Sequence, residues 1–523
     1  MKRRGFIKSM GALGLVSSVP SFFKNDYFVK QASAAPRILD ANMDLSGFTG
    51  GQRLPQVINI FLYGGPSELA GNLTNIDDIN MNSQNPYPSR LLAGDKSGVT
   101  TNEFWGSRVV NGNTGDLNDQ GAGGYIMEDM LRTQDMSIYR TINRRKNNTR
   151  AHRPSVFSSQ KGNLDIEMSG GVGSTLAGVL IENSGQLNGH SAIGGKQLNE
   201  MLLPFVSFEG SSTAFAPDSD YTIQNTQFKG ISLDTNFNNP FTRAVGVAGA
   251  SSADLDALVA KVTGSNATRF KKVDDAFVSR ELLEVELANV SNVTMPTVVG
   301  AEDIGPNNEY VDGAGLLVYP NNRYTERVRA AVSLAINNPD SLYITVGGGL
   351  GGWDDHDNSI VSYEDRMRDL MDTLRAAMKQ IRHSTRPGVH SAIPTDNIII
   401  NVHGDFGRNV NLNNSQGWDH GNNQNLYTFG GSAIRQGGIN ALGNVVGETE
   451  RFGDSGQNRQ FTRPTSSSYE IEPMSIASTV YSYFGVQNPE VLTSDPQMNP
   501  GGDPAINETV GVAPAAIDPQ IPV

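Results

Sequence analysis

The stretch Val57–Tyr63 (VINIFLY), closed by Gly64-Gly65-Pro66, decides the fold class. Its continuous apolar character is typical of a strand that is buried on both faces, as strands of parallel sheets are. Two further runs of the same kind lie far along the chain, at 342–346 and at 397–402. We therefore expect these three strands to be neighbours in one mostly parallel sheet, with their carboxyl ends at the same edge.

Helical patterns lie between and around these strands. The spacing of apolar residues predicts helices over 172–183, 266–290, 324–336, 362–383 and 473–484, and a further strand near 136–140. Helices and strands that alternate with short links indicate an α/β fold, in which helices flank a mostly parallel central sheet. The methionines along 362–383 are interpreted as core residues.

Composition divides the chain into three parts. Residues 1–34 form a signal segment, residues 35–485 form one α/β domain, and residues 486–523 form a tail rich in Pro, Asn and Gly. Within the domain, 70–130 and 205–265 are polar and show little periodicity, so we expect both to be loop-rich insertions. Glycine accounts for 57 of the 523 residues, which fits a chain with many turns.

The first residues resemble a twin-arginine export signal. Arg3 and Arg4 are adjacent, a weakly apolar run extends from Met10 to Phe23, and residues 32–34 (ASA) form a small-x-small cleavage sequence. The resemblance implies the twin-arginine translocase as a partner during export, and a destination in the periplasm, at the cell surface or outside the cell. The apolar run is shorter than the roughly 20 residues that a membrane span requires, so no stable span is expected.

Composition also excludes several kinds of chemistry. The chain has no cysteine, which rules out thiol nucleophiles, zinc–thiolate sites and iron–sulfur clusters. Its formal net charge is −13, and removal of the basic first 34 residues leaves it more acidic still. Non-specific binding of nucleic acid needs basic surface, so we expect no nucleic-acid partner. An acidic surface instead suits a protein that attracts cations.

Histidines and carboxylates follow the predicted strands. Asp354 and His356 come after strand 342–346, Asp405 and Arg408 come after strand 397–402, and His420 lies just beyond. Open α/β sheets bind ligands beyond the carboxyl ends of their strands. Imidazole together with carboxylate suits zinc, manganese or iron, and oxygen ligands alone suit calcium or magnesium. These residues therefore predict a divalent metal site, the alternative being that they cap helices and glycine-rich loops.

Three motifs resemble those of an exported family called domain of unknown function 1501. They are Trp353–His356 (WDDH), Asp405–Arg408 (DFGR) and Gly417–Gly421 (GWDHG), and Gly64–Ser67 resembles the early Gly-Gly-x-Ser loop of that family. The resemblance covers about residues 55–485. That family is similar in turn to the alkaline phosphatase and sulfatase superfamily, which implies a parallel α/β sandwich with a metal site at the strand ends.

The resemblance assigns roles to individual residues. It implies that Asp354, His356 and His420 are metal ligands and that Asp405 is a further acidic ligand. His152 falls in the position of the sulfatase nucleophile, which excludes formylglycine chemistry because that chemistry needs Cys or Ser there. The chain departs from the pattern at Phe406, where the superfamily has histidine, and after Glu68, where an aspartate is missing.

Two functions follow from these residues. The first is a metal-dependent hydrolase of phosphate or sulfate esters, in which the cation polarises the ester oxygen. There, Arg153 or Arg408 would bind the anionic group through bidentate hydrogen bonds, and His152 would act as nucleophile or general acid–base group. The second is a non-catalytic exported binding or cell-surface assembly protein with a degenerate metal site. The missing aspartate and the missing Ser, Thr or Cys nucleophile favour the second function, and the retained motifs favour the first.

Overall fold

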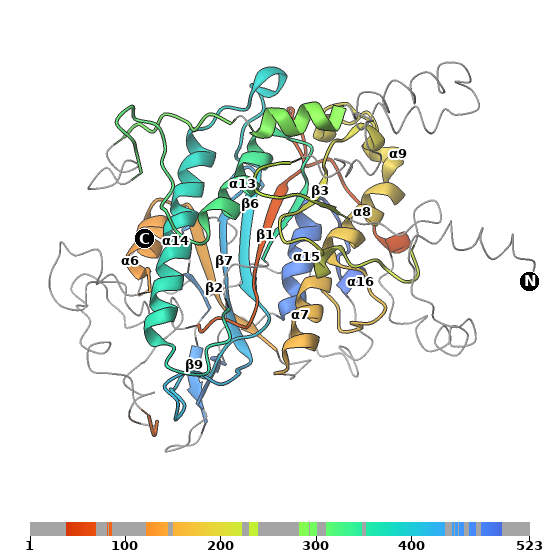
Figure 1. Ribbon diagram of the computed structural model, residues 1–523. Coiled ribbons are helices and arrows are strands. Elements are labelled where there is room, and N and C mark those ends of the chain that lie inside the picture. The colour runs from red at the N-terminus through yellow and green to blue at the C-terminus, as the bar shows by residue number, and fades with distance from the viewer. Residues whose placement is uncertain are drawn as a thin grey trace, which may run out of the picture.

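An eight-stranded sheet forms the centre of the computed structural model (Figure 1). The strand order is β4-β3-β5-β1-β6-β7-β2-β8, and β7 is antiparallel to both of its neighbours while the other neighbouring pairs are parallel. The strands are β1 (Gln56–Leu62), β2 (Met136–Asn143), β3 (Phe205–Ser207), β4 (Ile231–Ser232), β5 (Tyr343–Val346), β6 (Ile398–Gly404), β7 (Asn423–Gly430) and β8 (Val445–Val446). The predicted fold class, α/β with a mostly parallel central sheet flanked by helices, is confirmed.

Helices cover both faces of this sheet (Figure 1). They are α6 (Gly124–Arg132), α7 (His152–Lys161), α8 (Val172–Glu182), α9 (Ser184–Leu187), α13 (Thr325–Asn337), α14 (Ile360–His383), α15 (Pro473–Tyr483) and α16 (Glu490–Thr493). A separate hairpin pairs β9 (Thr449–Phe452) with β10 (Phe461–Pro464). The structure describes residues 38–68, 81, 83–85, 122–144, 150–221, 230–238, 282–291, 293–300, 310–347, 352–434, 442–443, 445–447, 449–453, 460–466 and 472–493. The predicted signal segment, residues 1–34, lies outside these residues.

The three apolar runs are neighbours, as predicted. Strand β1 lies between β5 and β6 and is parallel to both, with Ile58 opposite Ile344 on one side and Ile400 on the other. All seven residues of β1 are buried. This placement explains why the run is apolar without alternation, since both of its faces pack against helices.

Side chains of successive strand residues enter two different cores. Ile58, Ile344 and Ile400 belong to the larger core, which they share with residues of α6, α13 and α14. Val57 and Ile399 belong to the second core, shared with residues of α8 and α15. Figure 1 shows α6, α13 and α14 on one side of the sheet and α7, α8 and α15 on the other. The sheet is therefore the middle layer of an α/β/α sandwich.

A transverse row of polar side chains crosses the sheet, one residue from each of seven strands in register. In spatial order the row is Ser232, Ser207, Thr345, Asn59, Asn401, Thr428 and Ser137. All but Ser232 are buried. Because Asn59 alternates with Ile58 and Ile60 along β1, the row points away from the larger core and toward the layer of α7, α8 and α15. The Thr428 hydroxyl donates to Asn401 Oδ1 within this row at 2.8 Å.

The direction of the strands gathers their flanking loops at one edge. The parallel strands β1, β2, β5 and β6 all end there. Strand β7 is antiparallel to them, so it begins at that edge. The segments that follow the four parallel strands and the segment that precedes β7 therefore meet.

Some predicted loop regions contain elements of the fold. Strands β3 and β4 lie within 205–265 and extend the central sheet, so the first part of that segment is not an insertion on the fold. Helix α6 begins within 70–130 and ends at Arg132, and α16 lies within the predicted tail, where Leu492 is buried. Of the predicted helix 266–290, residues 282–290 are helical and the remainder lies outside the described residues. Among the described residues, none of the helices has the length and apolar character needed to cross a membrane.

The buried His403 of β6 makes the fold sensitive to acid. Its Nε2 lies 3.0 Å from Asn59 Oδ1, and burial lowers the pKa of its imidazole to about 4. In the unfolded chain the pKa of histidine is about 6.5, so the imidazole takes up a proton at pH values at which the buried imidazole of the folded chain stays neutral. This contribution to stability is therefore fully present above about pH 6.5 and is lost as the pH falls toward 4.

We expect His403→Gln to weaken this acid sensitivity. Between about pH 7 and about pH 5, the free energy of unfolding of the wild type should fall by about 2 kcal/mol more than that of the variant. Urea unfolding at the two pH values measures the difference. His383→Gln, at the last residue of α14, is the control and should leave the wild-type pH dependence intact. Equal pH dependence of wild type and His403→Gln would contradict the prediction.

Candidate metal centre

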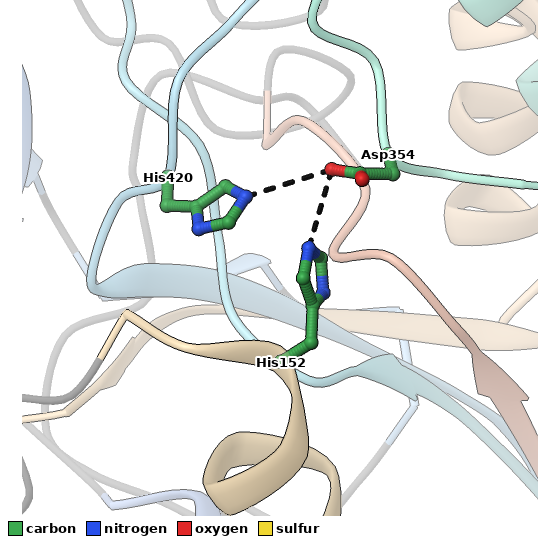
Figure 2. Close-up of side chains that lie close together, drawn as sticks. All are labelled: His152, Asp354 and His420. Carbon is green, nitrogen blue, oxygen red and sulfur yellow. Dashed lines mark ion pairs between the residues drawn. The ribbon is translucent and has the colours of Figure 1, made fainter.

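Three imidazoles surround one carboxylate oxygen at the carboxyl edge of the sheet. Asp354 Oδ1 lies 3.3 Å from His152 Nε2, 3.1 Å from His356 Nε2 and 3.5 Å from His420 Nε2. Figure 2 shows His152 and His420 both directed at this oxygen. The Nε2 atoms of His356 and His420 are 3.0 Å apart. His152, Asp354 and His420 form a group whose ligand atoms lie within 4.8 Å of one another, and His356 adjoins it.

These four side chains come from three segments at that edge. His152 is the first residue of α7, which follows β2. Asp354 and His356 lie between β5 and α14, and His420 lies just before β7. Backbone hydrogen bonds tie the last two segments together, since the Trp418 N–H donates to the Asp355 carbonyl at 2.7 Å. The centre therefore exists only when β2, β5 and β7 are in the same sheet.

The second ring nitrogen of each histidine faces an oxygen atom. Nδ1 of His152 lies 2.8 Å from Asp405 Oδ2, and Nδ1 of His420 lies 2.5 Å from the Arg150 carbonyl oxygen. Nδ1 of His356 lies 3.4 Å from Asp419 Oδ1. Oxygen acceptors at Nδ1 favour the tautomer with its proton there, which leaves the Nε2 lone pair for the centre. This is the arrangement that histidine ligands of metal ions have in proteins.

Asp405 is engaged away from the centre. The side chain is fully buried, its Oδ1 accepts the Gly64 N–H at 3.0 Å, and its Oδ2 pairs with His152 Nδ1. The sequence predicted Asp405 as a further metal ligand, whereas here both carboxylate oxygens already have partners. The structure places Asp405 behind His152, where it orients the imidazole ring.

Arg408 lies beneath the centre with all its donors in use. It donates to the carbonyl oxygens of Gly65 at 2.7 Å, Trp418 at 3.0 Å and Trp353 at 2.9 Å, and also to that of Gly64. Its Nη2 donates to Asp354 Oδ1 at 2.7 Å, and its Nη1 lies 3.4 Å from His356 Nε2. The guanidinium thus joins the segments after β1, β5 and β6 to the one before β7.

The sequence predicted Arg153 and Arg408 as anion-binding residues, but each guanidinium is engaged by groups of the protein itself. Arg408 is 1% exposed, and its hydrogen bonds hold the loops together. Arg153 is paired with Glu167 at 3.0 Å on the surface, where both side chains are more than half exposed. The anion site was predicted from the residue type alone. The sequence could not show the partners of the two guanidinium groups, because these come from other parts of the chain.

The charges around the centre favour ligands in their binding forms. Burial lowers the pKa of His420, which keeps its imidazole neutral. Burial alone would raise the pKa of Asp354, but the hydrogen bond and charge of Arg408 outweigh it and lower that pKa, so the carboxylate is ionised. The hydrogen bond that His152 donates to Asp405 raises the pKa of His152. A proton on His152 Nε2 would therefore compete with a cation for that atom.

The donor set fits a transition-metal ion such as zinc. Two ligand atoms that are bound to one tetrahedral zinc at about 2.0–2.1 Å lie about 3.3 Å apart. The separations from Asp354 Oδ1 to the three Nε2 atoms are 3.1–3.5 Å. Three imidazoles and one carboxylate also suit zinc better than calcium, which prefers six to eight oxygen ligands.

Sequence reasoning found most of this centre but assigned one member differently. Asp354, His356 and His420 meet as expected, and His152, expected as a catalytic group, lies among them. No signal in the sequence pointed to the Arg150 carbonyl, whose role depends on a backbone oxygen.

Comparison with protein-family models gives no match to this chain, and comparison with curated proteins gives none either.

Proposed function

We propose that the protein is exported and binds one divalent transition-metal cation through Asp354 and the Nε2 atoms of His152, His356 and His420. The observation that carries the proposal is the convergence of three Nε2 atoms on one carboxylate oxygen while each Nδ1 faces an oxygen acceptor. Lone pairs and a carboxylate at such short range repel one another unless protons or a cation lie among them. From the sequence motifs we also propose that the protein is related to the alkaline phosphatase and sulfatase superfamily.

The position of Arg408 supports a single cation. Its guanidinium shares Asp354 Oδ1 with the centre, at 2.7 Å, and is held by four carbonyl oxygens. Two-metal sites keep their ions about 3.5–4 Å apart. On the side of Asp354 that Arg408 occupies, a fixed positive charge already stands where a second ion would need to bind.

Metal content tests the proposal directly. Elemental analysis of natively exported protein is expected to give one metal ion per chain. In zinc titrations, His356→Ala and His420→Ala should each weaken binding at least 10-fold, because a ligand is lost. Trp353 and Trp418 flank the centre in sequence, so tryptophan fluorescence provides an independent signal. His390→Ala, in η6 (Gly388–His390) before the amino end of β6, is the control. Protein without stoichiometric metal would refute the centre.

Ester hydrolysis is the second candidate function, favoured by the exposure of the centre. The side chains of Asp354 and His152 are 48% and 38% exposed, so a substrate can reach them. A cation bound there would supply Lewis-acid polarisation of an ester oxygen. In this candidate function Asp354, His356 and His420 would hold the cation, which leaves His152 Nε2 for proton transfer. The buried Asp405 fixes the ring of His152, as general acid–base histidines require. We expect His152→Ala, assayed with enough zinc to saturate the three remaining ligands, to abolish turnover of nitrophenyl phosphate or sulfate. Absence of turnover in the wild type would favour a binding protein.

The export part of the proposal depends on Arg3 and Arg4. Twin-arginine signals are read by a receptor through the paired guanidinium groups, for which lysine is a poor substitute. We expect replacement of both by lysine to leave unprocessed precursor in the cytoplasm, detected by cell fractionation and immunoblotting. Normal processing of this double variant would show that another route exports the protein.

A further inference from the structure

We propose that Arg144 is a positioning residue that sets His152 in the metal centre by holding α7 against the end of β6. The inference rests on the proposed function, since it concerns the same centre. Arg144 follows β2 directly and is 1% exposed. The side-chain hydrogen bonds of Arg144 to other described residues go to Asp405, Ser155, Ser158 and Ser159 and to none of the four proposed ligands. Its effect on the centre would therefore be exerted through other residues.

The hydrogen bonds of Arg144 join two elements that meet behind the centre. Its Nε donates to the Asp405 carbonyl oxygen at 2.8 Å, and its Nη2 donates to the same oxygen. On the other side, Nη1 donates to Ser158 Oγ at 2.9 Å, and Nη2 donates to Ser159 Oγ at 2.6 Å and to the Ser155 carbonyl at 3.0 Å. One guanidinium therefore fixes the backbone of Asp405 relative to the first turns of α7.

This connection bears on the one ligand that α7 carries. His152 is the first residue of α7, and no side chain caps that end of the helix. The ring of His152 depends on the 2.8 Å contact between Nδ1 and Asp405 Oδ2. Because metal ligands must be held to within about 0.5 Å, a small shift of α7 relative to Asp405 would move Nε2 out of the centre.

The nature of the residue argues for more than packing. Burial lowers the pKa of Arg144 to about 10, so the group remains charged at neutral pH. A buried charge is costly to the fold unless its hydrogen bonds are made, and an apolar side chain could fill the same space. Five hydrogen bonds from one guanidinium, to the Asp405 carbonyl just after β6 and to three groups of α7, are instead suited to fixing a distance between them.

A double-mutant cycle with His152 tests the proposal. Zinc affinity is measured for the wild type, Arg144→Lys, His152→Ala and the double variant. We expect Arg144→Lys to weaken zinc binding about 10- to 100-fold when His152 is present, as loss of an outer partner of a metal ligand does. In the His152→Ala background, the same substitution should change affinity less than about 3-fold. Equal losses in both backgrounds would reduce Arg144 to general structural support and overturn the proposal.

Two further variants complete the test. Ser158→Ala combined with Ser159→Ala removes two acceptors but keeps the arginine, and it should weaken zinc binding in the same His152-dependent way even if Arg144→Lys fails to fold. Arg386→Lys is the matched control, because Arg386 is also buried and donates to the Ala335 and Ile336 carbonyls. It should lower the melting temperature without changing zinc affinity. A wild type that binds no zinc would refute the metal centre itself, which is a different outcome from equal losses.

Discussion

Arg408→Met is expected to destabilise the protein by about 3–5 kcal/mol, because each buried acceptor that loses its donor costs about 1–3 kcal/mol. The substitution leaves the carbonyl oxygens of Gly64, Gly65, Trp353 and Trp418 without their donor. It also removes the positive charge that lies 2.7 Å from Asp354 Oδ1. Against a typical total of about 5–15 kcal/mol, a loss of this size is a large part of the stability of the fold.

Urea unfolding of Arg408→Met measures this loss, and Arg408→Lys separates charge from geometry. Lysine keeps the charge but cannot present five donors in a planar fork, so we expect an intermediate loss. Arg463→Met is the control, since Arg463 and its partner Glu450 are 52% and 44% exposed and such pairs contribute about 0–1 kcal/mol. If Arg408→Met were no more destabilising than Arg463→Met, Arg408 would not be the residue that joins the loops.

Asp405→Asn is expected to weaken zinc binding about 10- to 100-fold while the chain stays folded. The reason is that the NH₂ group of asparagine would face one of the two groups that now donate to Asp405. Asp405 accepts two hydrogen bonds, from the Gly64 N–H and from His152 Nδ1, through its two oxygens. Asparagine has one oxygen and an NH₂ group, so one of the two partners must face a donor. If His152 faces it, the ring adopts the other tautomer, and its Nε2 carries a proton instead of a lone pair.

Calorimetric zinc titration and imidazole NMR of the same variant distinguish the outcomes. The NMR spectrum reports the tautomer of His152, and the titration reports its consequence for binding. Asp365→Asn, on exposed α14 surface where Asp365 pairs with Arg368, is the control. Unchanged affinity together with an unchanged tautomer would show that Asp405 does not orient His152.

The strands of the sheet could be predicted where burial on both faces leaves a continuous apolar run. That condition holds for β1, β5 and β6, which are found where the sequence places them. Strand β7 (NQNLYTFG) is buried along its whole length but begins with three amide residues. Their partners are distant in sequence: Asn423 Nδ2 donates to Glu68 Oε2, and Gln424 Oε1 accepts the Gly404 N–H. A pattern of residue types cannot reveal such pairing.

The site was predictable to the level of residue type and strand end. Asp354, His356 and His420 could be placed together because their segments follow or precede strands of one sheet. The sequence could not show that Asp405 orients the ring of His152 instead of facing the metal, or that His152 lies among the proposed ligands. Both depend on where the start of α7 lies relative to β6. Helix α7 itself (HRPSVFSSQK) lacks a clear apolar stripe, since the residues that it buries are Ser155, Ser158, Ser159, Gln160 and Lys161.

The polar row across the sheet has a consequence for misfolded alternatives. If any one of its strands slipped by a single residue, its polar member would move to the opposite face, among Ile58, Ile344 and Ile400. An aliphatic side chain would simultaneously enter the polar row. Each slip therefore carries two penalties, a polar group among apolar side chains and an apolar group in the polar row. An entirely apolar sheet of this size would tolerate shifted pairings of similar energy, whereas the polar row penalises each single-residue slip in this one.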